Sequence, residues 1–402
     1  MSAYKLRMDF RVSDKKQQFS AQKDGEEAAV CVFENGRLIL SVRYDCRPEP
    51  LILTCDAAAE DEIRIQLFPW RIELYRNGRL EDEEWPYGNC LLENAAFLPG
   101  GVRMEFSEPE EKSAGDEPAV LGSFTGAEGW KPDKNVFVGD CMPYCLDGRY
   151  HVLYLKDRHH HQSKWLRGAH QWAHISTADF LRWDIHPMAV EIDDPAEGSI
   201  CTGSWIRAGG IQYLYYTVRM CDGSSAPICR SVSDDGYHFR KDRSFSFHLS
   251  ARYTGASARD PKIVPDGSGL YHMFVTTSLA GEKKGCLAHL ISEDAERWEE
   301  VEPIYVAPGR DEPECSDYLE KDGWYYLIFS LRGKGQYRYS RKPFSDWQTP
   351  DNPEIPCQSV PKQAVWNGRI IFAGYRGNGA YAGTMTFAEA FVGSDGQLCF
   401  GK

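Results

Sequence analysis

Three acidic residues attract attention because each occupies a similar place relative to a predicted β-hairpin. Asp140, Asp260 and Glu314 lie seven to nine residues before the turn glycine of their hairpins. Carboxylates that converge in a fold repel one another and lose part of their hydration. Such a cost is usually tolerated only for function, and grouped carboxyl groups can supply nucleophiles and proton donors.

Five hairpin signals along the second part of the chain would position these acids. Each is a turn that contains glycine, followed by an alternating run rich in aromatic residues. Several units continue with a serine that leads to an aromatic residue, such as Ser176 to Trp183. The units recur at roughly 45 to 60 residues, which is typical of propeller blades. The five turns are Asp147-Gly148, Gly209-Gly210, Gly267 to Gly269, Asp322-Gly323 and Asn367-Gly368.

The sequence therefore predicts an all-β fold with a five-bladed β-propeller over residues 120–402. The first strand of each blade lines the central channel of a propeller. Because Asp140, Asp260 and Glu314 all stand near the start of a first strand, we expect them to meet at one end of that channel.

The first part of the chain, residues 1–108, is rich in alternating strand patterns but lacks the repeated unit. It predicts a small N-terminal β-sandwich, jelly-roll-like in form. Its aromatic residues could serve as a carbohydrate-binding surface, with Trp70, Trp85 or Tyr87 as the candidates. The safer interpretation is that they pack in cores and interfaces. Residues 109–119 are acidic and poor in apolar side chains, which indicates a linker or an exposed loop.

Composition narrows the class of protein. The 402 residues carry a net charge of -13, which argues against nucleic acid or an anionic membrane as partner. No apolar run is long enough to span a bilayer, and the first residues lack the apolar core of a signal peptide. Thirteen cysteines without CxxC pairs indicate reduced thiols in a cytoplasmic protein. The sequence indicates no cofactor and no metal, and it leaves a homo-oligomer open.

Short motifs in the predicted propeller resemble those of glycoside hydrolase family 32, the invertases, levanases and related β-fructosidases. Each motif is weak by itself, but their order and spacing agree with the family over most of the propeller. The matching segments are Asn135 to Asp140, His170 to Trp183, Thr202-Gly203-Ser204, Ser233 to Phe239, Arg259-Asp260-Pro261 and Glu314-Cys315.

The resemblance implies a retaining enzyme that hydrolyses a furanoside such as sucrose, a fructo-oligosaccharide or a phosphorylated analogue. It implies that Asp140 is the nucleophile, Glu314 the general acid/base and Asp260 the transition-state stabiliser. A retaining glycosidase needs one ionised and one protonated carboxyl group. We expect Arg259 to keep Asp260 ionised while Glu314 holds its proton, and Arg259 also to contact substrate.

Two departures from the family pattern leave alternatives open. The nucleophile usually stands in an Asn-Asp-Pro-Asn-Gly context, whereas here the segment 139–143 reads Gly-Asp-Cys-Met-Pro. The family's β-sandwich usually follows the propeller, whereas here a β-module precedes it. The first alternative is an inverting arabinofuranosidase or xylosidase of the family 43 type. The second is a carbohydrate-binding propeller without turnover.

A basic loop over residues 156–167 follows the first hairpin and is unusual in so acidic a protein. Either the loop is solvated or it contacts an anionic or phosphorylated saccharide through Lys156, Arg158, His160 and Lys164. Its three consecutive histidines also suggest a metal site, but adjacent side chains rarely point at one ion.

Three further residues are predicted to contact substrate because they lie in the matched motifs: Trp172, His174 and Ser204. Trp172 would either stack on a sugar ring or pack in the blade. Cys141 and Cys315 each neighbour a predicted catalytic acid. A thiolate is disfavoured beside carboxylates, so both are expected to be small packing groups.

Overall fold

The computed structural model describes residues 4–110, 117–357 and 359–401, and nearly all of the regular structure is β-strand. Within those residues the helical segments are a single turn, α1 (Ser163–Leu166), and the 3-10 turn η1 (Gly255–Ser257). Most of the predicted linker 109–119 lies outside the described residues. The predicted all-β class is confirmed.

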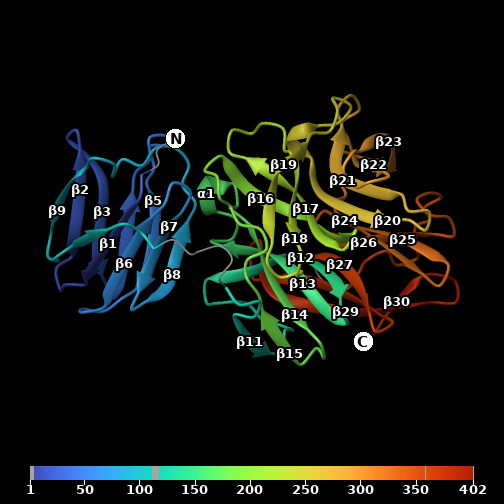
Figure 1. Cartoon of the computed structure of the whole chain (residues 1–402), viewed down its shortest axis with the longest axis horizontal. Helices are drawn as coiled ribbons and strands as arrows, with labels where there is room; N and C mark the ends of the chain where they lie inside the picture. Colours follow the sequence, from blue (N-terminus) through green and yellow to red (C-terminus); the bar gives the residue numbers. More distant parts are fainter. Residues whose placement is uncertain (1–3, 111–116, 358, 402) are drawn as a thin grey trace. The chain divides into compact units, whose positions relative to one another are not determined.

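The first part of the chain forms two antiparallel sheets of five strands each (Figure 1, blue). One sheet has the order β10-β1-β6-β7-β8 and the other the order β5-β4-β3-β2-β9. Apolar side chains from both sheets, such as Phe10, Leu40 and Ile65, share one buried core, as in a β-sandwich. The strands are β1 (Leu6–Arg11), β2 (Gln17–Lys23), β3 (Glu26–Glu34), β4 (Arg37–Val42), β5 (Leu51–Asp56), β6 (Glu62–Leu67), β7 (Ile72–Arg76), β8 (Arg79–Glu84), β9 (Ala96–Pro99) and β10 (Glu105–Ser107).

Two short segments from later in the sequence belong to this first compact unit, residues 163–169 and 192–197. In the first segment Lys164 is buried, and its backbone N–H donates to Glu84 at 3.1 Å. The ring of Trp165 packs edge-on against that of Tyr44, with ring centres 6.0 Å apart. The sandwich therefore recruits chain from the region that was predicted to be all propeller.

The second unit consists of five antiparallel meanders, in each of which consecutive strands pair (Figure 1, green to red). The first meander is β12 (Val136–Leu146), β13 (Arg149–Arg158), β14 (Gln171–Thr177) and β15 (Arg182–Ile185), with β11 (Gly122–Thr125) at its edge. The second is β16 (Glu197–Ala208), β17 (Ile211–Met220), β18 (Ile228–Ser233) and β19 (Arg240–Phe247). The third is β20 (Arg259–Pro265), β21 (Tyr271–Leu279), β22 (Lys284–Ser292) and β23 (Glu299–Val306). The fourth is β24 (Glu314–Lys321), β25 (Trp324–Leu331) and β26 (Lys334–Ser340), and the fifth is β27 (Ser359–Trp366), β28 (Arg369–Gly377), β29 (Gly383–Val392) and β30 (Leu398–Phe400).

The predicted turns lie where expected, between the first and second strands of the five meanders. In four of them both central residues have positive φ, for example 49° at Asp147 and 78° at Gly148. This geometry matches the twist of the flanking strands, and Asp, Asn and Gly tolerate it best. The hairpin turns therefore occur at the five predicted places, and the all-β architecture of a β-sandwich and propeller-like sheets agrees with the predicted fold class.

Each meander is covered on its faces by its neighbours. One apolar cluster joins Tyr215 of β17 to Met273 of β21, and another joins Tyr326 of β25 to Phe372 of β28. A sheet that buries both faces in this way needs partners on either side, which explains the stacking of repeated units. In the part of the chain that the structure describes, no helix is long and apolar enough to cross a membrane.

Candidate active site

The first strands of the five meanders line two cavities in succession. The starting halves of β12, β16, β20, β24 and β27 border a cavity of about 270 Å³. The later halves of the same strands border a second cavity of about 330 Å³. Asp140, Asp260 and Glu314 all line the first one, which we call the acidic cavity. The three acids come together although 120 and 54 residues separate them in the chain.

A β-bulge gives these acids their directions. In four of the first strands the register to the second strand shifts by one residue at the same place, for example between Val138 and Cys141. Bulges turn side chains that regular alternation would direct elsewhere. Glu314 is the last paired residue before its bulge, whereas Asp260 and Asp140 lie inside theirs. The three acids therefore occupy neighbouring positions of the repeat. The sequence had suggested that these positions were equivalent.

The bulges also contain strained backbone. In three of the meanders the residue directly after the last paired position before the bulge has a positive φ. The values are 58° at Asp260, 53° at Cys315 and 46° at Val360. Positive φ is unfavourable for residues other than glycine, above all for a β-branched valine. All three residues line the acidic cavity. Strain repeated at one end of the channel is a mark of a functional site.

Asp140 is held by three donors from three other strands or loops. The hydroxyl of Thr202 donates to its Oδ2 at 2.6 Å, and the phenol of Tyr381 donates to its Oδ1 at 3.1 Å. The thiol of Cys315 donates to Oδ2 at 3.4 Å. A Cβ at Gly139 would lie 2.6 Å from the Tyr381 hydroxyl, so glycine is needed there for the close approach.

Asp260 shares the Cys315 donor with Asp140. The backbone N–H of Cys315 donates to Asp260 Oδ2 at 3.0 Å, and its Sγ lies 3.4 Å from the same oxygen. Burial, and then the charges of Asp260 and Asp140, raise the pKa of the Cys315 thiol well above its usual value. Cys315 therefore stays a neutral hydrogen-bond donor that joins two carboxylates, a larger part than the packing role expected for it.

Arg259 is shared by several carboxylates. Its Nη2 donates to Glu314 Oε1 at 2.8 Å, its Nη1 donates to Glu312 Oε2 at 2.5 Å, and its Nε lies 3.6 Å from Asp260 Oδ2. Arg259 favours the ionised form of Asp260, as the hypothesis required, but burial opposes it more strongly. Burial, reinforced by Asp140 and Glu314 and only partly offset by Arg259, raises the pKa of Asp260 to about 6.

Three residues of the matched motifs lie outside the acidic cavity. Trp172 is fully buried, and its Nε1 donates to the Cys201 carbonyl at 2.9 Å. His174 is buried among other histidines of the first blade. Ser204 borders the second cavity, where its hydroxyl donates to the Pro261 carbonyl. Their positions suit packing and not sugar contact, because burial leaves no surface for a ligand.

Four residues of the basic loop also lie outside the lining of the acidic cavity. Arg158 is buried and donates to Asn135 at 3.0 Å, and Lys156 is half-buried on β13. His160 contacts the carbonyl of Tyr381 through Nδ1 at 2.9 Å. Lys164 belongs to the first unit, where its ammonium donates to the Glu197 carbonyl. None of these four lines the cavity, so direct substrate contact by them has no support in the geometry.

The structure brings other residues to the cavity that the sequence reasoning did not single out. Besides Thr202 and Tyr381, they are His161, His170 and Arg219. His170 Nε2 donates to Asp157 at 2.9 Å, and its ring stacks on that of Tyr381 with centres 4.9 Å apart. His161 lies within the basic loop and His170 three residues after it, whereas the histidine predicted there to contact substrate was His160. No signal in the sequence marked Tyr381 or Arg219.

Potential metal ligands gather elsewhere. Among residues 4–110, 117–357 and 359–401, one group of three such side chains has its ligand atoms within 4.8 Å of one another: His151, His174 and His186. None of the three lines the acidic cavity. The chemistry available in the cavity is therefore that of carboxyl, guanidinium, phenol and imidazole groups.

Comparison with known proteins agrees with this geometry. The family model "Glycosyl hydrolases family 32 N-terminal domain" matches residues 124–347, more than half of the chain. Raffinose invertase of Escherichia coli is 25% identical over 234 residues, which are 52% of this chain and 43% of that protein. Sucrose-6-phosphate hydrolase of Escherichia coli is 26% identical over 236 residues, with 53% and 43% covered. The matched part thus spans less than half the length of either relative.

Solved structures show the same fold. Fructan 1-exohydrolase IIa from Cichorium intybus superposes with a TM-score of 0.57 at 16% identity. The superposition covers 69% of this chain and 60% of that one. The chain belongs to the glycosyl hydrolases of family 32.

Proposed function

We propose that this protein is a retaining glycosidase that hydrolyses a β-fructofuranosidic bond in sucrose, a fructo-oligosaccharide or a phosphorylated analogue. One observation carries the proposal: Asp140, Asp260 and Glu314 line one cavity at the starting end of the first strands. Family membership supports the reaction class. We further propose that the five meanders are the blades of a five-bladed propeller and that residues 1–108 act as a separate module.

The proposed reaction has two steps. Asp140 attacks the anomeric carbon while Glu314 gives its proton to the leaving oxygen, so that the glycosidic bond breaks and a glycosyl ester forms. Glu314, now ionised, then takes a proton from water, which attacks the ester and releases Asp140. The three donors on Asp140 hold it in one orientation. Asp260 accepts hydrogen bonds from sugar hydroxyls.

Glu314 must leave Arg259 before it can donate a proton. In the free protein its Oε1 accepts from Arg259, and its side chain is 43% exposed. Glu312 accepts from the same guanidinium and also from Ser278 at 2.6 Å, so it can hold Arg259 when Glu314 turns to the substrate. We therefore assign Arg259 and Glu312 as positioning residues of the acid.

A phosphate group on the substrate would find one guanidinium in the cavity that is not engaged. Arg219 forms no hydrogen bond or ion pair with the residues that the structure describes. Burial, with the charges of His170 and Arg219, lowers the pKa of neighbouring His161 to about 4, so this histidine is neutral near pH 7. Arg219 is therefore our candidate for recognising a phosphorylated sugar. Three relatives carry the name sucrose-6-phosphate hydrolase.

We propose a cytoplasmic location, which agrees with thirteen cysteines that are all free thiols. Sugars that are phosphorylated during uptake would be met in that compartment. The partner is a small saccharide or sugar phosphate.

A substrate panel tests the proposal. It contains sucrose, fructo-oligosaccharides, sucrose 6-phosphate and nitrophenyl arabinofuranoside, and the anomer of the first product is recorded by NMR. We expect fructose release with retained configuration. Inversion on the arabinofuranoside would favour the family 43 type of reaction, and binding without any turnover would favour a carbohydrate-binding propeller.

A further inference from the structure

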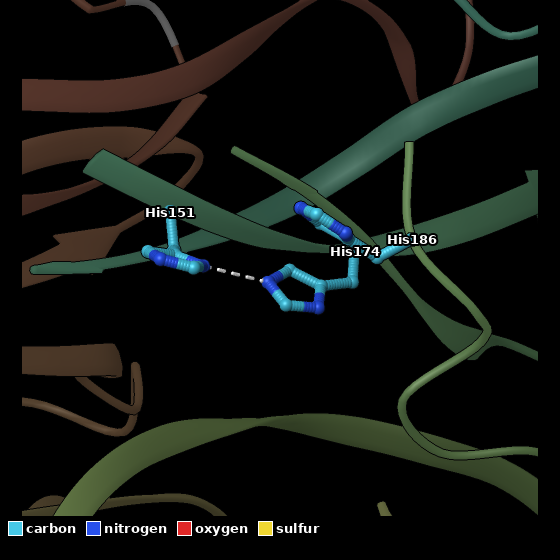
Figure 2. Close-up of side chains that lie close together, drawn as sticks. All are labelled: His151, His174 and His186. Atoms are coloured by element: carbon cyan, nitrogen blue, oxygen red, sulfur yellow. Dashed lines mark hydrogen bonds between the residues drawn. The ribbon is translucent and has the colours of Figure 1, made fainter. Parts of the chain in front are cut away.

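Three histidines of the first blade form a buried cluster away from the acidic cavity. His151 lies on β13, His174 on β14, and His186 directly after β15. Their exposed fractions are 0%, 1% and 3%. Figure 2 shows the three rings turned toward a common space, with His151 and His174 joined by a hydrogen bond. One ligand atom from each lies within 4.8 Å of the other two.

His186 is oriented like a typical metal ligand. Its Nδ1–H donates to the carbonyl of Ala119, which fixes the tautomer and leaves the lone pair on Nε2. In the free protein the hydroxyl of Ser176 donates to this Nε2 at 2.8 Å. Histidines that bind metals commonly donate the other ring N–H to a backbone carbonyl or a carboxylate.

The other two rings leave polar atoms without partners. His151 Nδ1 and His174 Nε2 share one hydrogen bond of 2.9 Å, and the hydroxyl of Tyr144 lies 3.2 Å from the same His174 Nε2. The remaining nitrogens, His151 Nε2 and His174 Nδ1, are buried and have no hydrogen-bond partner. Whichever ring donates, one buried N–H and one buried lone pair stay unsatisfied, and buried polar atoms rarely do so without a reason.

The electrostatic surroundings keep these rings neutral. Burial, followed by the charges of His186 and Arg149, lowers the pKa of His151 to about 3, and burial lowers that of His174 as well. The nearby cation, Arg149, is paired with Asp184 at 2.6 Å. Neutral imidazole is the form that binds a metal ion.

We propose that His151, His174 and His186 form a structural site for a divalent transition-metal ion, of which Zn²⁺ is the natural probe. Zn–N bonds of about 2.0–2.1 Å place tetrahedral ligand nitrogens roughly 3.3 Å apart, so the rings need only a small inward turn. Each neutral ring keeps one N–H and offers one lone pair, so binding needs tautomer exchange but no net loss of protons. A fourth ligand would be water. The ion would tie together β13, β14 and the segment after β15.

The third blade offers a matched control. His272 Nδ1 and His289 Nε2 form the same hydrogen bond at 2.8 Å, with ring centres 5.1 Å apart. There the adjoining ring is Phe344, stacked on His272 with centres 3.8 Å apart. This pair offers two imidazoles where the first blade offers three. It should therefore bind the ion far more weakly.

The experiment measures metal content and thermal stability of the full chain. Protein stripped with EDTA is dialysed against Zn²⁺ or Co²⁺, and bound metal is counted by mass spectrometry. We expect one ion per chain, a rise in melting temperature of at least about 3 °C, and visible absorption bands of tetrahedral Co²⁺.

Three variants separate this site from other histidines. His186→Phe, which places a phenyl ring beside the pair as Phe344 does beside His272, should weaken Zn²⁺ binding by more than about 100-fold. His289→Gln should leave it unchanged, and so should His159→Ala in the basic loop. If His186→Phe fails to fold, His174→Gln is measured instead. Binding of less than a tenth of an equivalent by the wild type, or binding lost equally in His289→Gln or His159→Ala, would overturn the proposal.

Discussion

The two cavities along the first strands differ in chemistry although the same five strands line both. The acidic cavity gathers the three acids Asp140, Asp260 and Glu314, and two guanidinium groups, those of Arg259 and Arg219, also line it. In the second cavity opposite charges pair closely: Lys262 lies 2.6 Å from Asp317. Buried Lys362 donates there to the Gly203 carbonyl at 2.9 Å.

The difference separates function from stability along one channel. In the second cavity each lysine has a partner at hydrogen-bond distance, which offsets part of the cost of burying its charge. In the acidic cavity negative charge exceeds positive charge, and the strained bulges add to the cost. An arrangement that destabilises the fold but collects nucleophile, acid and stabiliser is expected where a reaction takes place.

Exchange of one side chain in each cavity tests whether the two cavities have separate roles. Asp140→Asn should lower kcat by on the order of 10⁴-fold or more on every substrate, because the amide cannot attack. Its unfolding midpoint in urea should hardly change. Steady-state kinetics and denaturation on the same preparation measure both.

The matched variant in the second cavity is Lys262→Met. It should keep kcat within about 3-fold but lose roughly 3 kcal/mol of unfolding free energy, because buried Asp317 loses its ion-pair partner. If Lys262→Met lost activity as severely as Asp140→Asn while staying folded, the division of roles between the cavities would be wrong.

Glu314→Gln sharpens the assignment within the acidic cavity. We expect turnover of the natural substrate to fall by about 10²–10⁴-fold, because the leaving oxygen is no longer protonated. Substrates with good leaving groups need little protonation, so their kcat/KM, which reports formation of the ester, should fall much less than that of the natural substrate. Parallel kinetics on sucrose and on a nitrophenyl fructoside make the measurement. Equal losses on both would argue against Glu314 as the acid.

Asp260→Asn should lower activity and raise the free energy of unfolding. The pKa of Asp260 is about 6 in the folded protein against 3.8 ordinarily, so its ionisation destabilises the fold above pH 6. This difference corresponds to about 3 kcal/mol. Above pH 6 the free energy of unfolding of the variant should exceed that of the wild type by up to this amount. The difference should shrink as the pH falls. It should vanish below about pH 4, where the aspartate of the wild type is protonated in both the folded and the unfolded state. Urea denaturation across this range measures it, and a constant difference at all pH values would contradict the account.

Arg219→Ala gives the smallest expected effect. The specificity constant for sucrose 6-phosphate should fall by about 10–100-fold, because one charge-assisted contact is lost. That for sucrose should not change. Arg158→Ala is the control in the basic loop and should leave the ratio of the two constants unaltered. If Arg158→Ala changed the ratio of the two specificity constants and Arg219→Ala did not, the basic loop would be the phosphate-binding element instead.

Much of the fold followed from local patterns, because turns such as Asp322-Gly323 have a stereochemical cause that acts within four residues. The convergence of the three acids followed from the repeat. The bulges did not, since a one-residue register shift leaves no mark in composition. Cavity residues that lie in loops, such as Tyr381, could not be predicted from the sequence either. Lys164 shows the limit most clearly, because nothing local reveals that its segment joins the first unit.

In the proposed reaction Asp140 forms a covalent bond to the sugar inside the acidic cavity, and this bond can be detected directly. Glu314→Gln, supplied with an activated fructoside, should accumulate this intermediate, because the ester forms but no base assists its hydrolysis. Mass spectrometry of the peptic digest should then find one fructosyl group on the peptide that contains Asp140. An unmodified Asp140 peptide during active turnover, with product of inverted configuration, would contradict the account.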